Sequence, residues 1–269
     1  MARTSTKRKR LARNRHKGIA ILSVSLVVLG AGSAGYIFLK QSRTQLDAET
    51  LCPKTGPTSI TAILIDSTDP LAAVQKDYVQ KYFDEFSESI PDGAMVSMYS
   101  ASAYSEQQFA PTAQLCNPGD GSGASELTAN PQRLRQRWQE MFREPFRNMV
   151  ETDIERGSAS QSPLLEMLKA LSVDAFPLKD RVSPLQLIIV SDMLANTSQY
   201  SHYRNDVSFE SLREQPYFVH LFPNLRDVDV RVLYVGRAGQ EDIQTRQHAE
   251  FWAAYFEFVG ARLKSIKRI

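Results

Sequence analysis

Two carboxylates follow two apolar stretches of the chain, and hydroxyl side chains stand close to each of them. The run "AILI" leads into Asp66 and Thr68, and the run "LQLIIV" leads into Ser191 and Asp192. Ser162 opens a third segment, "SPLLEML". Carboxylate and hydroxyl oxygens are hard ligands of the kind that suit Mg²⁺. An aspartate after a strand could instead become phosphorylated, or could cap a helix.

Strand-like and helix-like patterns alternate around these residues. Short apolar runs bounded by turn formers predict buried strands, and apolar residues at three- and four-residue spacing predict helices. The predicted strands are 59–67, 94–102, an edge strand within 107–117, 185–193 and 228–236. The predicted helices are 71–90, 131–150, 162–172 and 247–266. This order predicts an α/β fold with an open, largely parallel, doubly wound sheet, in which ligands gather at the carboxyl ends of the strands.

The polar loops next to these helices also have a purely structural interpretation. Asp69 followed by Pro70 is typical of a helix start, because the carboxylate accepts a bond from the first turn and proline lacks the N–H that would be unpaired there. Ser162 followed by Pro163 has the same pattern. In this interpretation the loop after Asp66 only joins a strand to a helix.

The start of the chain predicts a membrane anchor. Residues 1–17 carry eight lysine and arginine residues and no acidic residue, and 18–39 is a run of 22 uncharged, mostly apolar residues. A helix of about 20 residues crosses the hydrocarbon core of a bilayer. The small residues at 31–34 would also suit a cleaved signal peptide, but the apolar run continues through Leu39 and favours an uncleaved anchor.

Charge gives this anchor a direction. Basic residues before a span stay in the cytoplasm, so we expect a single-pass cytoplasmic (inner) membrane protein with the bulk of the chain periplasmic or extracellular. A polar linker is predicted at 40–57 and one domain at 58–269. Residues 18–269 hold 24 basic and 30 acidic residues, which argues against nucleic-acid binding by the domain.

Both cysteines, Cys52 and Cys116, come after the predicted span. An even number of cysteines in an exported domain predicts a disulfide, and two unrelated buried thiols are the alternative. A zinc site built on the cysteines is disfavoured, because the chain has no CxxC pattern and its four histidines do not cluster in sequence.

The residues at the predicted strand ends resemble the von Willebrand factor A (vWA) domain and its metal-ion-dependent adhesion site, over about residues 58–265. That family has an Asp-x-Ser-x-Ser turn after its first strand, a threonine in a second loop and an aspartate after its fourth strand. Asp66 and Thr68 match the first two positions of the turn, Ser162 resembles the loop threonine, and Asp192 resembles the last aspartate. The resemblance implies that these four residues bind Mg²⁺. The chain departs from the pattern at the third hydroxyl position, which is Pro70.

The resemblance implies a protein-binding module in a bacterial membrane or envelope complex, held by a bilayer anchor at 18–39, rather than an enzyme. In such a domain the segment 198–206, "SQYSHYRND", would help to recognise the partner. A metal-dependent hydrolase or phosphotransferase using Asp66 and Asp192 is the alternative function, and a structural anchor with an inactive site is a third. Motifs of other enzymes are missing: the chain has no GxxxxGK[ST] loop, and no second acid follows Asp66 at the spacing of aspartyl-phosphate enzymes.

Overall fold

The computed structural model describes residues 22–33, 35, 45–66, 68–105, 109–122, 130–155, 161–177, 181–204 and 207–269. The chain divides into two compact units, residues 1–45 and residues 46–269. In the first unit, residues 22–33 are helical with exposed side chains. Among the described residues, none of the helices combines the length and the apolar composition that a bilayer crossing requires. The predicted tail, and residues 18–21, 34 and 36–39 of the predicted span, lie outside the described residues, so the anchor stays a prediction.

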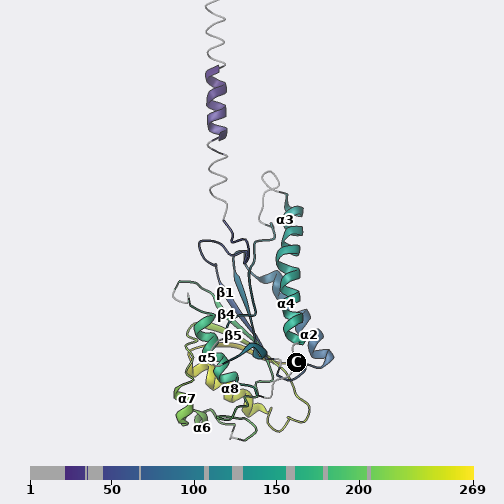
Figure 1. Cartoon of the computed structure of the whole chain (residues 1–269), viewed down its shortest axis with the longest axis vertical. Coiled ribbons are helices and arrows are strands. Elements are labelled where there is room, and N and C mark those ends of the chain that lie inside the picture. The colour runs from purple at the N-terminus through teal and green to yellow at the C-terminus, as the bar shows by residue number, and fades with distance from the viewer. Residues whose placement is uncertain are drawn as a thin grey trace, which may run out of the picture. The chain divides into compact units, whose positions relative to one another are not determined.

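The second unit is an α/β domain built on one six-stranded sheet, as the sequence predicts (Figure 1). The strands are β1 (Ile60–Ile65), β2 (Met95–Ser100), β3 (Ala113–Cys116), β4 (Leu185–Ser191), β5 (Val228–Tyr234) and β6 (Arg262–Arg268). Their spatial order is β3-β2-β1-β4-β5-β6, and every pair is parallel except β2 with β3. This is the strand order of a doubly wound sheet, with an antiparallel strand at one edge.

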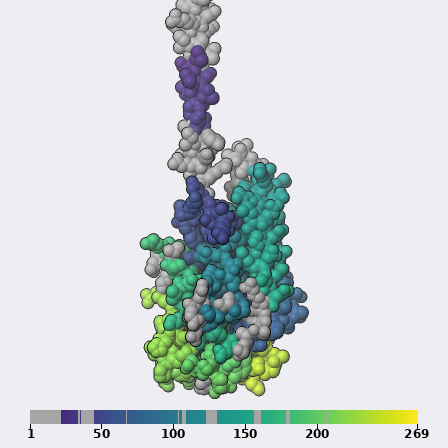
Figure 2. Space-filling model, in the orientation of Figure 1, coloured from purple at the N-terminus to yellow at the C-terminus, as the bar shows by residue number. Residues whose placement is uncertain are grey.

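Helices cover both faces of the sheet (Figure 1). One face packs against α2 (Ala73–Ser89), α3 (Pro131–Trp138), a π-helical turn (Gln139–Arg143) and α4 (Glu144–Glu155). The other packs against α5 (Leu164–Asp174), α6 (Phe209–Arg213), α7 (Pro216–Val219) and α8 (Arg246–Phe258); a short 3₁₀ turn (Ala101–Ala103) follows β2. Figure 2 shows the stretch 131–155, in teal, along one side of the domain. All six residues of β1 are buried, as expected of a central strand covered on both faces.

The end of the chain differs from the prediction, because the helix expected at 247–266 ends at Phe258 and a strand follows it. Gly260 has φ +79°, a conformation that commonly ends helices and that glycine adopts without strain. A β-bulge in the β5–β6 pairing places one extra residue between Leu263 and Ile266. Both side chains therefore pack on the same core although they are three residues apart, a spacing that otherwise indicates a helix.

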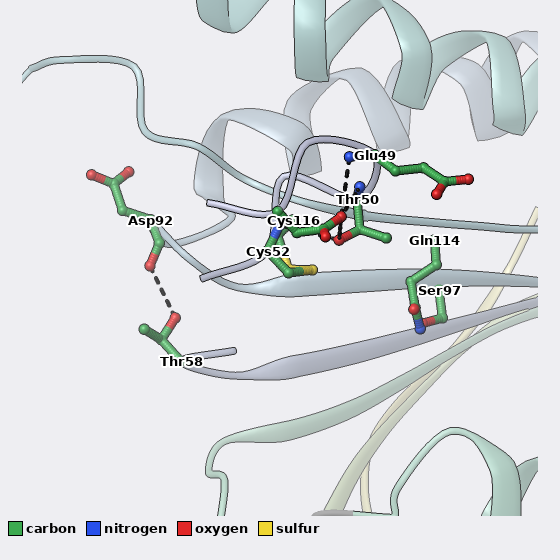
Figure 3. The surroundings of a disulfide bond; sticks show 9 residues. Glu49, Thr50, Cys52, Thr58, Asp92, Ser97, Gln114 and Cys116 are labelled. Atoms are coloured by element: carbon green, nitrogen blue, oxygen red, sulfur yellow. Dashed lines mark hydrogen bonds between the residues drawn. A yellow bond between two sulfur atoms is a disulfide. The ribbon is translucent and has the colours of Figure 1, made fainter. Parts of the chain in front are cut away.

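The segment 46–57, predicted as a linker, belongs to the compact domain. Cys52 and Cys116 form the predicted disulfide, with the sulfurs 2.05 Å apart (Figure 3). The N–H of Cys116 donates to the carbonyl of Thr50 at 2.8 Å, and Leu51 is 4% exposed. Cys116 pairs with Met95 at the amino end of β2. The chain is therefore fixed to the sheet at the end where its parallel strands begin.

Candidate functional site

The parallel strands of the sheet all begin at one end and finish at the other, which gives the domain an amino rim and a carboxyl rim. The carboxyl rim comprises the loops that follow β1, β4 and β5 (66–70, 192–197 and 236–237) together with residues 161–163 before α5. The amino rim comprises segments 46–59, 90–95 and 116–120 at the opposite end. All four residues that the sequence predicts as metal ligands lie at the carboxyl rim.

Asp66 is the centre of the carboxyl rim. Its N–H donates to the carbonyl of Val190 at 2.8 Å, which extends the pairing of β1 with β4. Its Oδ2 accepts hydrogen bonds from the hydroxyls of Ser191 at 2.8 Å and Ser162 at 3.3 Å. Its Oδ1 accepts one from the N–H of Thr68 at 3.2 Å. The residue is only 2% exposed, so this carboxylate ties three segments together from inside.

Ser162 reaches Asp66 because its loop pairs with the loop after β4. Its N–H donates to the carbonyl of Asn196 at 2.9 Å, and the N–H of Asn196 donates back at 2.8 Å. The expectation that Ser162 caps the following helix is wrong: α5 begins at Leu164, and Pro163 is the residue before it. The hydroxyl is used by Asp66 instead of by the helix.

Asp192 is the second buried carboxylate of the carboxyl rim, at 3% exposed. Its Oδ1 accepts a hydrogen bond from the N–H of Leu194 at 2.9 Å, and its Oδ2 accepts one from Nε of Arg237 at 2.8 Å. Burial, and then the negative charge of Asp66, raise the pKa of Asp192 to about 6, against the lowering effect of its two hydrogen-bond donors. The raised pKa indicates a carboxylate whose charge is incompletely compensated.

Arg237 is the residue of the site that the sequence reasoning missed. It follows β5, and its guanidinium clamps two loops: besides Asp192, it donates to the carbonyl of Pro70 at 2.6 Å and to that of Asp69 at 3.0 Å. The amide of Gln244 donates to the carbonyl of Asp192 at 3.0 Å and accepts from the N–H of Arg237 at 2.7 Å. The sequence does contain a signal for it, because an arginine three residues after the end of a parallel strand falls at the same rim as Asp66 and Asp192.

A cavity of about 130 Å³ opens at the carboxyl rim. It is lined by Thr68, Asp69, Gln161, Ser162, Asp192, Leu194, Asn196 and Tyr203. Thr68 is 7% exposed, and within the described part of the chain its hydroxyl has no hydrogen-bond partner. Tyr203, in the predicted recognition segment 198–206, is 43% exposed. Burial and the nearby charges of Asp192 and Asp69 raise the pKa of its phenol.

The helix-capping interpretation of Asp69 and Pro70 is wrong. Helix α2 begins at Ala73, and the N–H of Ala72 is bound by the side-chain oxygen of Gln75 at 3.0 Å. Asp69 is exposed and lines the cavity instead. The carboxylate of Asp69 is therefore not used to start the helix.

The four expected ligands come together, but the donor set does not fit a divalent cation held by carboxylates. Arg237 already places a positive charge on Asp192, and it binds the carbonyl of Pro70, the position where the resemblance requires a hydroxyl. Across the described residues, no group of three or more histidine, cysteine, aspartate or glutamate side chains is arranged to hold a metal ion. Mg²⁺ binding stays a prediction of the sequence.

The fold and the rim define an α/β domain with an open, mostly parallel sheet and a polar cavity at the carboxyl ends of its strands. No protein-family model matches the chain, and a search of curated proteins finds no relative with significant similarity. The geometry of the carboxyl rim therefore carries the functional conclusion.

Proposed function

We propose that this chain is a membrane-anchored, vWA-like protein-binding module, a component of a bacterial membrane or envelope complex, and that it binds its partner at the carboxyl rim. The observation that carries the proposal is one polar cavity lined by segments 68–69, 161–162 and 192–196 together with Tyr203. The contacts of Ser162 with Asp66 and of Arg237 with Asp192 hold these segments together. Asp66 follows the first strand and Asp192 the fourth, which is the order that the vWA resemblance requires.

The state of the two carboxylates favours binding over catalysis. Asp66 is enclosed, and its two oxygens accept three hydrogen bonds, so it is poorly placed to attack a substrate. Asp192 is held between Leu194 and Arg237. The alternative, a metal-dependent hydrolase or phosphotransferase that uses Asp66 and Asp192, needs at least one of them free to reach a substrate or an ion.

The position of the carboxyl rim suits a tethered binding module. Residue 46, where the domain begins, lies at the amino rim, so the chain reaches the domain at the end of the sheet opposite the cavity. A disulfide forms and persists in oxidising compartments such as the periplasm, in agreement with a domain on the far side of the cytoplasmic membrane. The basic residues 1–17 and the apolar run 18–39 supply the expected anchor and its direction.

Site-specific photocrosslinking tests the proposal on the full chain in its native membranes. A photoreactive phenylalanine analogue replaces Tyr203 at the cavity, and a matched control replaces Phe222, an aromatic residue of similar exposure (50% against 43%) that does not line the cavity. We expect a discrete protein adduct from position 203 that disappears when Asp69→Lys is added and persists with Asp77→Lys on α2. Equal adducts from both positions, or an adduct from Phe222 alone, would contradict the proposal.

A further inference from the structure

We infer that the cavity of the carboxyl rim receives a basic side chain of the partner protein, as a monovalent organic cation bound without a metal. The inference rests on the proposed function and names the chemistry of the ligand. The ligand is either a lysine ammonium or an arginine guanidinium, both of which are monovalent cations that only donate hydrogen bonds.

Charge is the first observation. Asp66, Asp69 and Asp192 bring three carboxylates to the carboxyl rim, and Arg237 bonds one of them, Asp192. Two other described arginines reach the same rim but bond backbone carbonyls there, Arg204 that of Thr197 and Arg268 that of Gln244. The described residues that line the cavity include two of these carboxylates and no lysine or arginine. A cationic group that entered would meet the carboxylates of Asp69 and Asp192 in the lining and would be attracted by them.

Unused acceptors are the second, independent observation. Thr68 is 7% exposed and lines the cavity, and its hydroxyl has no hydrogen-bond partner among the described residues. A hydroxyl that lines the cavity without a partner in the protein can accept a hydrogen bond from a ligand that enters. Ser162 donates its proton to Asp66 and so presents only oxygen lone pairs to a ligand. An ammonium offers three donors and no acceptor, which matches this lining.

The mouth of the cavity adds an aromatic side chain. Tyr203 is 43% exposed and lines the cavity together with Asp69 and Asp192. Aromatic rings attract lysine and arginine cations, and more strongly where the cation is desolvated. Tyr203 combined with the two carboxylates therefore favours a basic side chain over a neutral or acidic one.

The fixed guanidinium of Arg237 explains why the expected ligand carries one charge. It bonds Asp192 at 2.8 Å and the carbonyl of Pro70 at 2.6 Å. Its positive charge therefore already compensates negative charge at the positions where the resemblance places metal ligands. A divalent ion would add two charges beside it and would lack the third hydroxyl ligand. A monovalent side chain needs only hydrogen-bond acceptors and the remaining negative charge.

The test titrates short peptides into the full chain in lipid nanodiscs, followed by saturation-transfer NMR. The probes are acetyl-Gly-Lys-Gly-amide, its arginine counterpart, its norleucine counterpart as a neutral isostere, and its glutamate counterpart with Mg²⁺. We expect the lysine or arginine peptide to bind with a Kd on the order of 1 mM, the stronger of the two identifying the cation. Binding should be unaffected by EDTA and weakened by salt, and the norleucine peptide should not bind.

Paired variants locate the binding. Asp69→Asn should weaken the basic peptide about three- to fivefold, the scale of a partly exposed charge pair, while Asp77→Asn on α2 should leave it unchanged. Thr68→Val should weaken it as well, since it removes the unused acceptor.

Two results would overturn the inference and leave the proposed function standing. One is binding of the glutamate peptide that depends on Mg²⁺. The other is no binding of either basic peptide while the crosslink at Tyr203 persists and depends on Asp69. Absence of both the peptide binding and the crosslink would overturn the proposed function as well.

Discussion

The two ends of the sheet are each tied together by buried polar side chains, but with different chemistry. At the amino rim the central group is a neutral amide, Asn117, which is 4% exposed. Its Nδ2 donates to the carbonyl of Ile90 at 2.6 Å, and its Oδ1 accepts from Nε1 of Trp138 and from the N–H of Gly119, both at 2.9 Å. At the carboxyl rim the loops are held together by the carboxylates of Asp66 and Asp192 and by the guanidinium of Arg237.

The difference shows which end has capacity for a ligand. An amide contains donors and acceptors, so Asn117 is satisfied by its neighbours without burying a charge. Carboxylates only accept, and among the described ion pairs Asp192 is the carboxylate of the carboxyl rim that is joined to an arginine. The polar groups of Asn117 are therefore paired at the amino rim, which the disulfide also closes, whereas at the carboxyl rim the hydroxyl of Thr68 has no partner among the described residues.

Acidification should distinguish the two ends most strongly, because buried histidines pack behind the carboxyl rim. His202 is 2% exposed, and its Nδ1 accepts from the N–H of Ala195 at 3.0 Å, so the neutral ring carries its proton on Nε2. Its ring packs edge-to-face on that of His248, 4.6 Å between centroids. Burial, and then the nearby His248, lower the pKa of His202 to about 2, and burial lowers that of His248 to about 4.

Both folded pKa values lie below the unfolded value of about 6.5, so the histidines contribute stability that is present above pH 6.5 and lost as pH falls. Each contributes about 1.4 kcal/mol per pH unit while its folded form stays neutral, so we expect a loss of up to about 5 kcal/mol between pH 6.5 and 4.5. Asp192 offsets part of this loss of stability on acidification. Its raised folded pKa contributes stability that is present below about pH 4 and is lost as pH rises through about 6.

Urea unfolding followed by tryptophan fluorescence at a series of pH values would measure this loss. His202→Asn should reduce the slope by about half, because one of the two histidines is removed. A free energy of unfolding that is independent of pH over this range would contradict the assignment of two neutral, buried histidines.

Removing Arg237 should have the next largest effect. Arg237→Met leaves Asp192 buried without its cation, which typically destabilises by about 3–5 kcal/mol. The loss should shrink at acidic pH, where Asp192 binds a proton, and the double variant Asp192→Asn/Arg237→Met should recover part of the stability. Urea unfolding at pH 8 and pH 5 measures both effects.

Arg135 on α3, which bonds Asp120 of the amino rim, is the matched control for Arg237. It bonds Glu88 at 2.8 Å and Asp120 at 2.7 Å, but its side chain is 39% exposed. Arg135→Met should therefore lose no more than about 1 kcal/mol. Equal losses at Arg135 and Arg237 would remove the contrast between an exposed and a buried ion pair.

Most of the fold could be predicted from the sequence because its signals are local. The alternation of apolar runs with helical spacing gave the five strands β1 to β5, and the direction of parallel strands placed Asp66 and Asp192 at one rim. Strand β6 could not be predicted in this way. Its bulge gives Leu263 and Ile266 the spacing of a helix, and a bulge is decided by pairing with β5 rather than by local sequence.

The site was predictable in its carboxylates but not in its contacts. A strand end fixes where an aspartate lies, whereas the partner of its carboxylate depends on the path of loops from other parts of the chain. Ser162 has a capping pattern, yet it bonds Asp66 because its loop pairs with Asn196. Arg237 reaches Asp192 across 45 residues of sequence, a contact that no spacing rule contains.

Loss of the disulfide should sharpen the comparison, because it affects the amino rim alone. Cys52 and Cys116 are 64 residues apart, and removing a bridge over such a loop typically lowers stability by about 2–4 kcal/mol. The double variant Cys52→Ser/Cys116→Ser should show that loss in urea, with the pH dependence of unfolding unchanged. It should also retain the Asp69-dependent crosslink at Tyr203. Loss of the crosslink in the folded variant would show that the two ends are coupled.

Asn117→Ala should lower the stability by about 2 kcal/mol, because it leaves the indole N–H of Trp138 and the carbonyl of Ile90 buried without their partner. The loss should not vary with pH between 5 and 8, since no ionisable group is involved. Asn117→Asp is the informative counterpart. The new carboxylate would face the carbonyl of Ile90, so that two hydrogen-bond acceptors would lie against each other. Protonation of the carboxylate would restore a donor, so this variant should gain stability as pH falls. The amino rim would then titrate as Asp192 does, and unfolding curves at pH 5 and pH 8 would show whether charge is what separates the two ends; a variant insensitive to pH would contradict that explanation.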